Sequence, residues 1–111
     1  MQITVTPESF RLTQVFTIAR GAKTRADVLT VRVSDGTHRG WGECVPYGRY
    51  GESLQSVSEQ IESLPENATR ADLPDLLPPG AARNAVDCAL WDLEAKQTGR
   101  RVWDLAGLPA P

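Results

Sequence analysis

The residues of this 111-residue chain that could act as general acids or bases have no suitable partner nearby in the sequence. The one histidine is His38, and the two lysines, Lys23 and Lys96, lie far apart, so no Lys-x-Lys pair occurs. Glu43, near the end of a predicted strand, has the chemistry of a general base, but we expect it to anchor backbone through a hydrogen bond. We therefore predict no catalytic residue in this chain.

The acidic residues of segment 81–98 are not spaced for metal binding. Asp87 and Asp92 point to different sides of a helix, because successive residues are turned by about 100°, and Glu94 joins neither. Pairing at i, i+4 predicts ion pairs of Asp92 with Lys96 and of Arg83 with Asp87, each of small energetic value. We predict no metal ligand here and expect these carboxylates to be solvated or ion-paired.

The two cysteines, Cys44 and Cys88, do not form a C-x-x-C pair and have no neighbouring histidine. This spacing argues against a metal or redox site. We expect both to be reduced and buried as small hydrophobic side chains.

The composition is typical of one globular domain that spans residues 1–111, with 41% hydrophobic and 23% charged residues. The net charge is -2 and the longest basic run is Arg100–Arg101, so we expect neither a nucleic-acid partner nor a membrane partner. The start MQITVTPESF lacks the features of a signal peptide, and no apolar run is long enough to cross a bilayer. A cytoplasmic location is the expectation.

The first half of the chain predicts a three-stranded antiparallel meander. Apolar and polar residues alternate over residues 3–5, 10–12 and 28–33, which is the period of a strand. Residues 34–37, SDGT, predict a turn, and residues 38–45 predict the third strand.

Two segments have the composition of surface loops. Residues 17–27, TIARGAKTRAD, are cationic and contain a glycine, so we expect a mobile loop between the first two strands. Residues 46–52, PYGRYGE, bring two tyrosines, an arginine and two glycines together ahead of a helix.

Helices follow the strands, which predicts an α+β fold. Ser53 is a suitable N-cap for a helix to about residue 63, and Thr69 for a short helix over residues 70–77. A last helical turn is expected at residues 102–105.

Residues 81–98, AARNAVDCALWDLEAKQT, predict an alanine-rich helix that Gly80 and Gly99 terminate. Its apolar surface is wider than a single stripe, and its small alanines would let another backbone come close. We expect this helix to pack against a larger body, so the isolated chain would expose an apolar patch and could form a homo-oligomer. The apolar surface comprises Ala81, Ala82, Ala85, Val86, Cys88, Ala89, Leu90 and Leu93.

Three segments, FTIARG, WGECVPYGRYGES and GAARNAVDCALWDLEAKQTGRRVWDLAGL, together carry a specific resemblance. Over essentially all its residues the chain resembles the N-terminal capping domain of the enolase superfamily, in the muconate-lactonizing subgroup, and most closely that of L-Ala-D/L-Glu dipeptide epimerases. The resemblance implies a three-stranded meander followed by a helical layer. It also implies a C-terminal (β/α)₈-type barrel, which these residues do not contain.

In such enzymes, removal of a proton α to a carboxylate creates a dianionic enolate that a divalent metal stabilises. The resemblance places Mg2+ and both catalytic lysines on the barrel, which would be the partner of this domain. The small-molecule substrate would be a dipeptide, and the chain alone would be inactive.

The resemblance also implies that residues 17–27 and 46–52 close over the barrel mouth and select the substrate. The substrate-binding residues expected in these loops are Arg20, Lys23, Arg25, Tyr47 and Tyr50. A cation would recognise the second carboxylate of a dipeptide that ends in an acidic residue. Lys23 stands where close relatives carry an arginine. A lysine keeps the positive charge but cannot make the planar, bidentate hydrogen bonds of a guanidinium group to a carboxylate. Solvated loop charges, and tyrosines that pack on the barrel rim, are the open alternatives.

Two other functions also stay open. One is another enzyme of the subgroup, such as an N-acylamino acid racemase, an o-succinylbenzoate synthase or a cycloisomerase. Its substrate recognition would depend less on a cationic first loop. A truncated, non-catalytic interaction module would pair with itself or with a separate barrel.

Overall fold

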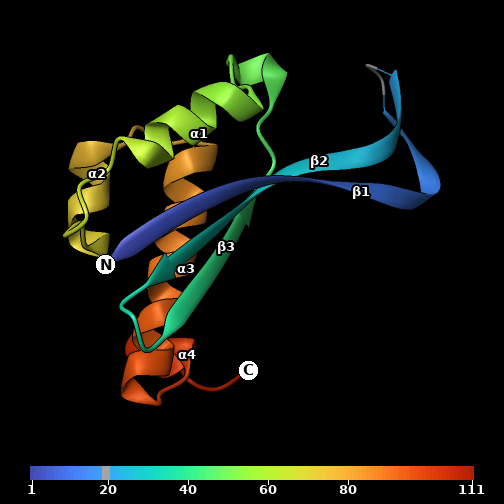
Figure 1. The fold of residues 1–111 in the computed structure, drawn as a ribbon. Helices are drawn as coiled ribbons and strands as arrows, with labels where there is room; N and C mark the ends of the chain where they lie inside the picture. The colour runs from blue at the N-terminus through green and yellow to red at the C-terminus, as the bar shows by residue number, and fades with distance from the viewer. Residues whose placement is uncertain (19–20) are drawn as a thin grey trace.

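The first half of the chain folds into an antiparallel sheet in the strand order β1-β2-β3 (Figure 1). The strands are β1 (Gln2–Ile18), β2 (Gly21–Ser34) and β3 (Arg39–Cys44). The computed structural model describes residues 1–18 and 21–111. Alternation along β2 turns Leu29, Val31 and Val33 toward the helices, where all three are buried. The predicted meander is confirmed.

The second half forms a helical layer on one face of this sheet (Figure 1). Its elements are η1 (Gly48–Tyr50), α1 (Leu54–Glu62), η2 (Arg70–Asp72), α2 (Leu73–Leu76), α3 (Ala81–Thr98) and α4 (Val102–Leu105). Ser53 caps α1 as predicted, because its hydroxyl accepts the backbone N–H of Ser56 at 3.0 Å. The segment predicted as one short helix after Thr69 is split into η2 and α2. Among the described helices, none is both long and apolar enough to cross a bilayer.

Helix α3 places its backbone directly on β3 at two glycines. A Cβ on Gly42 would overlap the carbonyl oxygen of Ala85, and a Cβ on Gly40 would overlap the carbonyl oxygen of Ala89. Any larger residue at these positions would push the helix off the strand. The predicted approach of another backbone to the alanine-rich helix is therefore confirmed, and that backbone belongs to the chain's own strand.

The expectation that this helix needs a larger outside body is wrong for the face that carries most of its apolar residues. The buried residues of α3 are Ala82, Ala85, Val86, Ala89, Leu90 and Leu93. They join β2, α1 and α2 in one core, to which α1 contributes Val57 and Ile61. Cys88 is exposed, so its predicted burial is also wrong, whereas Cys44 is buried as predicted. The reason is geometric, since the sheet covers only the side of α3 opposite Cys88.

The cationic segment over residues 17–27 is a second correction. Strands β1 and β2 stay paired beyond the pair Arg11↔Arg25, through Phe16↔Lys23, to Ile18↔Gly21, with a register shift between Arg11 and Phe16. A loop was predicted because charged residues indicate exposure to solvent. A two-stranded ribbon with exposed side chains meets that requirement equally well while its backbone groups pair. Arg20 lies outside the described residues.

Candidate functional site

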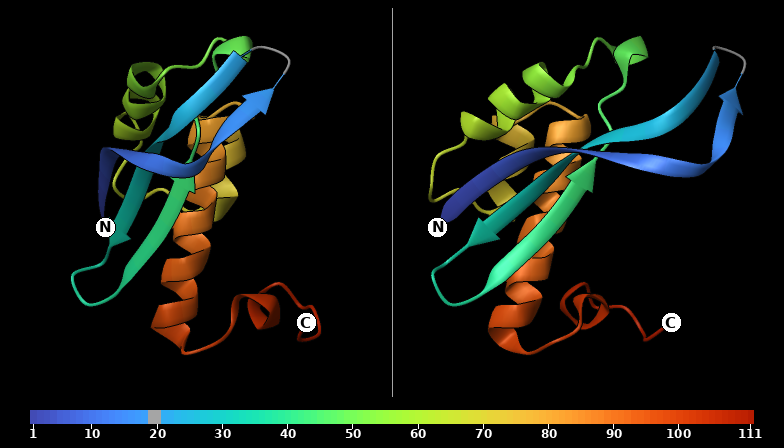
Figure 2. Two further views of the ribbon diagram at one scale, coloured as in Figure 1. Left: turned by 90° about the vertical axis from the view of Figure 1, so that its right-hand side faces the viewer. Right: turned by 45° about the vertical axis from the view of Figure 1, so that its right-hand side comes forward.

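The paired ends of β1 and β2 project from the body of the domain. We call residues 12–18 and 21–25 the arm. Its side chains include exposed apolar groups, of which Val15 is 59% and Phe16 is 57% exposed. Figure 2 shows that the arm leaves the helical layer and that its tip rises toward the end of the molecule that carries η1, away from α4.

A cleft of about 840 Å³ lies between the arm and the start of the helical layer. We call it the arm cleft. On the far side it is bounded by Val45, Pro46, Ser53 and Leu54. Its arm side combines apolar groups such as Leu12 and Phe16 with the cations Lys23 and Arg25, so it offers both apolar surface and positive charge.

A second, smaller cleft joins the tip of β2 to the segment that contains η1. We call it the loop cleft; it measures about 420 Å³ and is lined by residues 21–23 and 46–49. Lys23 lines both clefts. Parts of the two segments that the resemblance implied would act together, residues 17–27 and 46–52, therefore line one cleft, although the first segment is paired as strands rather than a loop.

The two described cations of the arm differ in their contacts. Arg25 donates from Nε to the Ser9 hydroxyl at 2.9 Å and from Nη2 to the Ser9 carbonyl at 3.5 Å, so its guanidinium is held on β1. Lys23 is exposed, and its ammonium group makes no hydrogen bond or ion pair with any residue that the structure describes. Of these two candidates, Lys23 is better placed to meet an anion.

The tyrosines lie together, with ring centroids 5.3 Å apart and planes inclined by 58°. Tyr47 is half-buried and lines the loop cleft with Lys23. Tyr50 is 75% exposed and instead lines a recess beside Glu52 and Gly80. The structure thus brings Tyr47 and Lys23 to one cleft and leaves Tyr50 outside both clefts.

Glu52 holds the segment of the tyrosines in place, a role that the sequence analysis missed. Its Oε1 accepts the backbone N–H of Tyr47 at 3.1 Å, and its Oε2 accepts the backbone N–H of Ala81 at 2.9 Å. No local pattern pairs Glu52 with a residue so distant in sequence. By contrast, Glu43 is exposed and its carboxylate accepts no hydrogen bond in the described part of the chain, so the predicted anchoring role of this side chain is wrong.

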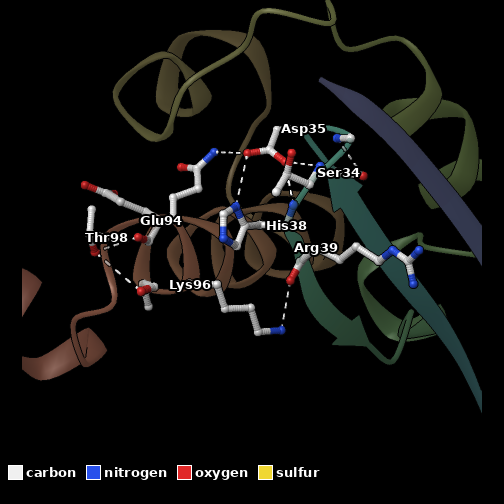
Figure 3. Close-up of polar contacts among 11 residues, drawn as sticks. Ser34, Asp35, His38, Arg39, Glu94, Lys96 and Thr98 are labelled. Atoms are coloured by element: carbon white, nitrogen blue, oxygen red, sulfur yellow. Dashed lines mark hydrogen bonds and ion pairs between the residues drawn. The ribbon is translucent and has the colours of Figure 1, made fainter.

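One acidic residue of α3, Asp92, binds the neighbouring strand β3. Asp92 Oδ2 accepts the backbone N–H of Trp41 and the Nζ of Lys96, both at 2.9 Å, which confirms the predicted Asp92–Lys96 ion pair. Lys96 also donates to the Arg39 carbonyl at 2.8 Å (Figure 3). The ammonium group of Lys96 therefore joins α3 to β3.

Two further side chains of α3 make contacts that the sequence did not indicate. Glu94 forms an ion pair with Arg70 at 2.6 Å, and the same guanidinium lies 3.5 Å from the ring centroid of Trp91. Arg83 contacts the Leu77 carbonyl at 3.5 Å, so its predicted pairing with Asp87 is wrong.

The turn between β2 and β3 is held by Asp35. Its Oδ1 accepts the backbone N–H groups of His38 at 2.6 Å and Thr37 at 2.7 Å, and its Oδ2 accepts Nε2 of Gln97 at 2.8 Å (Figure 3). The His38 N–H, the Gln97 amide and the Thr37 N–H, in that order of importance, hold the pKa of Asp35 well below its ordinary value. These bonds indicate that the carboxylate of Asp35 has a structural role, because it holds the turn and links it to α3.

The described residues do not fit a metal ion. Within residues 1–18 and 21–111, no group of three His, Cys, Asp or Glu side chains is placed to hold one. Burial, aided by the charges of Glu52 and Glu43, raises the pKa of Cys44 to about 11, which keeps it a thiol at neutral pH.

Comparison with known proteins places this geometry in a family. Residues 1–107 match the family described as mandelate racemase / muconate lactonizing enzyme, N-terminal domain. The L-Ala-D/L-Glu epimerase of Escherichia coli (strain K12) is 45% identical over 98% of this chain and 35% of its own length. The N-acetyl-D-glutamate racemase of a Pseudoalteromonas species is 44% identical over 70% of this chain and 27% of its own length.

Solved structures agree with these relatives. An enolase family member from Agrobacterium tumefaciens with homology to dipeptide epimerases, with bound sodium and L-Ala-L-Glu and an ordered loop, has a TM-score of 0.90 and 50% identity. The match covers 97% of this chain and 35% of that one. A solved L-Ala-D/L-Glu epimerase has a TM-score of 0.86 and 40% identity, over 99% of this chain and 34% of that one.

The chain thus spans about a third of the length of these proteins. Its described residues form the sheet and the helical layer, without the barrel that the resemblance implied. The fold and the sequence match lead to the same family. The chain belongs to the mandelate racemase / muconate lactonizing enzyme N-terminal domain family of the enolase superfamily.

Proposed function

We propose that residues 1–111 are the capping domain of a dipeptide epimerase and help to select its substrate. The observation that carries the proposal is Lys23, a cation without a partner among the described residues, which lines both the arm cleft and the loop cleft. The relatives supply the reaction class, because they include an L-Ala-D/L-Glu epimerase and a hydrophobic dipeptide epimerase from Roseobacter litoralis.

The substrate would be a dipeptide whose C-terminal residue is acidic. An ammonium group beside a half-buried tyrosine offers a charge-assisted hydrogen bond to a carboxylate. The Agrobacterium tumefaciens structure, which is 50% identical, holds L-Ala-L-Glu. Other relatives were solved with L-Leu-L-Tyr or L-Arg-D-Lys, so membership of the family does not by itself specify an acidic residue. The proposal assigns that choice to Lys23.

The metal and the proton-transfer groups would lie on a barrel in the complete protein. Several relatives were solved with Mg and a dipeptide. A bound Mg2+ ion would stabilise the negative charge that develops when the α-proton leaves. The contribution of the present residues would be to recognise the side chain of the substrate and to exclude water above it.

The test measures α-proton exchange into deuterated water with the full-length protein that carries these residues. Lys23→Ala is expected to raise KM for L-Ala-L-Glu at least about tenfold, since a hydrogen bond to a charged group is worth about 1.5–3 kcal/mol. KM for L-Ala-L-Leu should change little, and Lys23→Arg should retain most of the selectivity.

Arg11→Ala is the matched control, because Arg11 is an exposed cation of β1 that lines neither cleft. Exchange with none of the dipeptides tested would contradict the proposed reaction. An equal rise of KM for the acidic and the apolar dipeptide in Lys23→Ala would contradict the role of the charge.

Racemization of an N-acylated acidic amino acid is the second candidate. The Pseudoalteromonas relative, an N-acetyl-D-glutamate racemase, is almost as similar in identity as the Escherichia coli epimerase. An N-acetyl glutamate carries the same side-chain carboxylate, so Lys23 suits both. A comparison of kcat/KM for N-acetyl-glutamate and L-Ala-L-Glu separates the two functions.

A further inference from the structure

Glu52 joins two segments that lie far apart in the sequence. One carboxylate oxygen accepts the N–H of Tyr47, at the start of the segment that contains η1, and the other accepts the N–H of Ala81, the first residue of α3. Glu52 is itself half-buried. Each oxygen therefore binds the backbone of a different element, an arrangement that we call the Glu52 clamp.

The N-terminus of α3 requires such a partner. The first N–H groups of a helix have no acceptor within the helix, and they carry partial positive charge. The residue before α3 is Gly80, which has no side chain to cap it. A Cβ on Gly80 would lie 3.0 Å from Oε2 of Glu52, so the absence of a side chain there also leaves room for the carboxylate.

The other end of the clamp reaches the loop cleft. Tyr47 lines that cleft with Lys23, and the turn after it is closed by the N–H of Tyr50 on the Tyr47 carbonyl at 3.0 Å. Helix α3 is packed on β3 at Gly40 and Gly42 and contributes six buried residues to the core, so it is a firm support. The clamp thus fixes the backbone of Tyr47 to a helix that is packed in the core.

We propose that Glu52 is a positioning residue for substrate recognition: it holds Tyr47 at the loop cleft, opposite the arm that carries Lys23. This inference depends on the proposed function, because it assigns the loop cleft to the dipeptide. Glu52 acts through Tyr47 and need not touch the substrate. Loss of the clamp removes the bond that ties the backbone of Tyr47 to α3, so Tyr47 should be held less firmly at the cleft, which weakens binding without changing the proton-transfer groups.

Hydrogen exchange on the full-length protein tests the clamp directly. In Glu52→Ala, exchange of the Tyr47 and Ala81 amides should accelerate about tenfold or more, while amides of β2 in the core should keep their rates. Glu52→Gln, which keeps one acceptor oxygen, should give a smaller acceleration. Glu62→Gln is the control, because Glu62 is exposed and its carboxylate has no partner in the described part of the chain.

Kinetics test the effect on substrate. Glu52→Ala is expected to raise KM for L-Ala-L-Glu about fivefold with kcat nearly unchanged, and Glu52→Gln should restore part of the loss. Glu52→Ala made in a Tyr47→Ala background should have little further effect on KM, because Glu52 acts on substrate binding through the side chain of Tyr47. A purely structural role would add its cost in both backgrounds.

Three results would overturn the inference. Unchanged exchange at Tyr47 would show that the clamp does not hold it, and accelerated exchange with an unchanged KM would remove the role in recognition. If no dipeptide undergoes α-proton exchange, the proposed function fails and the substrate role of Glu52 fails with it. Selective acceleration at the Tyr47 amide would distinguish that result from a failure of the clamp itself.

Discussion

The two halves of strand β2 have opposite surroundings. Residues 28–33 lie against α3 and the helical layer, and Leu29 and Val31 have no exposed surface. Residues 21–25 continue the same strand into the arm, where every side chain is exposed and the pairing with β1 has passed a register shift. One half contributes to stability through packing, whereas the other leaves its side chains available to a ligand.

The glycines of β3, which pairs with the inner half of β2, indicate that this packed part of the sheet should tolerate little change. A larger or smaller side chain on the arm is accommodated by solvent. A Cβ on Gly42, by contrast, would overlap backbone atoms of α3, and a backbone cannot relieve the overlap by changing a side-chain rotamer. Substitutions should therefore affect stability at the inner half and ligand selectivity at the outer half. The following predictions test this division, from the largest expected effect to the smallest.

The double variant Gly40→Ala/Gly42→Ala should have the largest effect. Each added methyl group overlaps backbone atoms of α3, so together they are expected to cost more than about 4 kcal/mol and to prevent native packing. Urea unfolding followed by circular dichroism measures this. Gly48→Ala is the control, because a Cβ there meets nothing within 4 Å, and a midpoint equally low in the control would refute the argument.

Leu29→Ala and Phe16→Ala compare an inner position with an arm position. Leu29 is 0% exposed, and its truncation should leave a cavity and cost about 2–5 kcal/mol. Phe16 is 57% exposed, and its truncation should cost less than about 1 kcal/mol. The free energies of unfolding in urea decide the question, and similar losses would mean that the arm is packed in solution.

Asp35→Asn should lower stability in a pH-dependent manner. The folded pKa of Asp35 lies below its ordinary value of 3.8, because backbone N–H groups and Gln97 bind the charged form. The charged carboxylate therefore stabilises the fold fully above pH about 4, and this contribution is lost as the pH falls through the folded pKa. The difference in unfolding free energy between the parent and Asp35→Asn should be largest near pH 7 and shrink toward pH 2.

Asp75→Asn is the control for that series, because Asp75 is exposed and its carboxylate has no partner in the described residues. A difference for Asp35→Asn that stays constant from pH 7 to pH 2 would show that the charge of Asp35 has no part in stability.

The cysteines should show the smallest effect on stability and a clear difference in reactivity. Cys88 lies on the exposed side of α3, whereas Cys44 is buried and its pKa is raised to about 11. A thiol reagent at neutral pH should modify Cys88 alone in the native chain, and both cysteines after unfolding, as mass spectrometry would show. Cys88→Ser should change the free energy of unfolding by less than about 0.5 kcal/mol. Prompt labelling of Cys44 would mean that the contact of α3 with β3 opens readily.

Helices were predicted well because their signals are local. The hydroxyl of Ser53 caps the helix that follows it, and Gly99, in the left-handed conformation at φ 68°, ends α3 where the sequence places a glycine. The arm was predicted poorly because charge reports exposure and does not report pairing. Residues 21–25 are exposed as expected, yet they are a strand because β1 supplies a partner.

The candidate site was predictable only in part. The resemblance pointed to Lys23 and Tyr47, which do line one cleft. It could not separate Lys23 from Arg25, because that difference depends on Ser9, which lies across the strand pair. It also gave Tyr50 the same weight as Tyr47, although their rings lie in different surroundings.

The sequence by itself determined the order of strands and helices, the ends of α3 and the family, because periodicity, capping residues and motif spacing are properties of neighbouring residues. Only the tertiary structure decided that β3 covers α3, that Arg25 is held on β1, and that Glu52 joins the loop of Tyr47 to Ala81. These contacts join residues distant along the chain, and their energy depends on distances that exist only once the chain has folded.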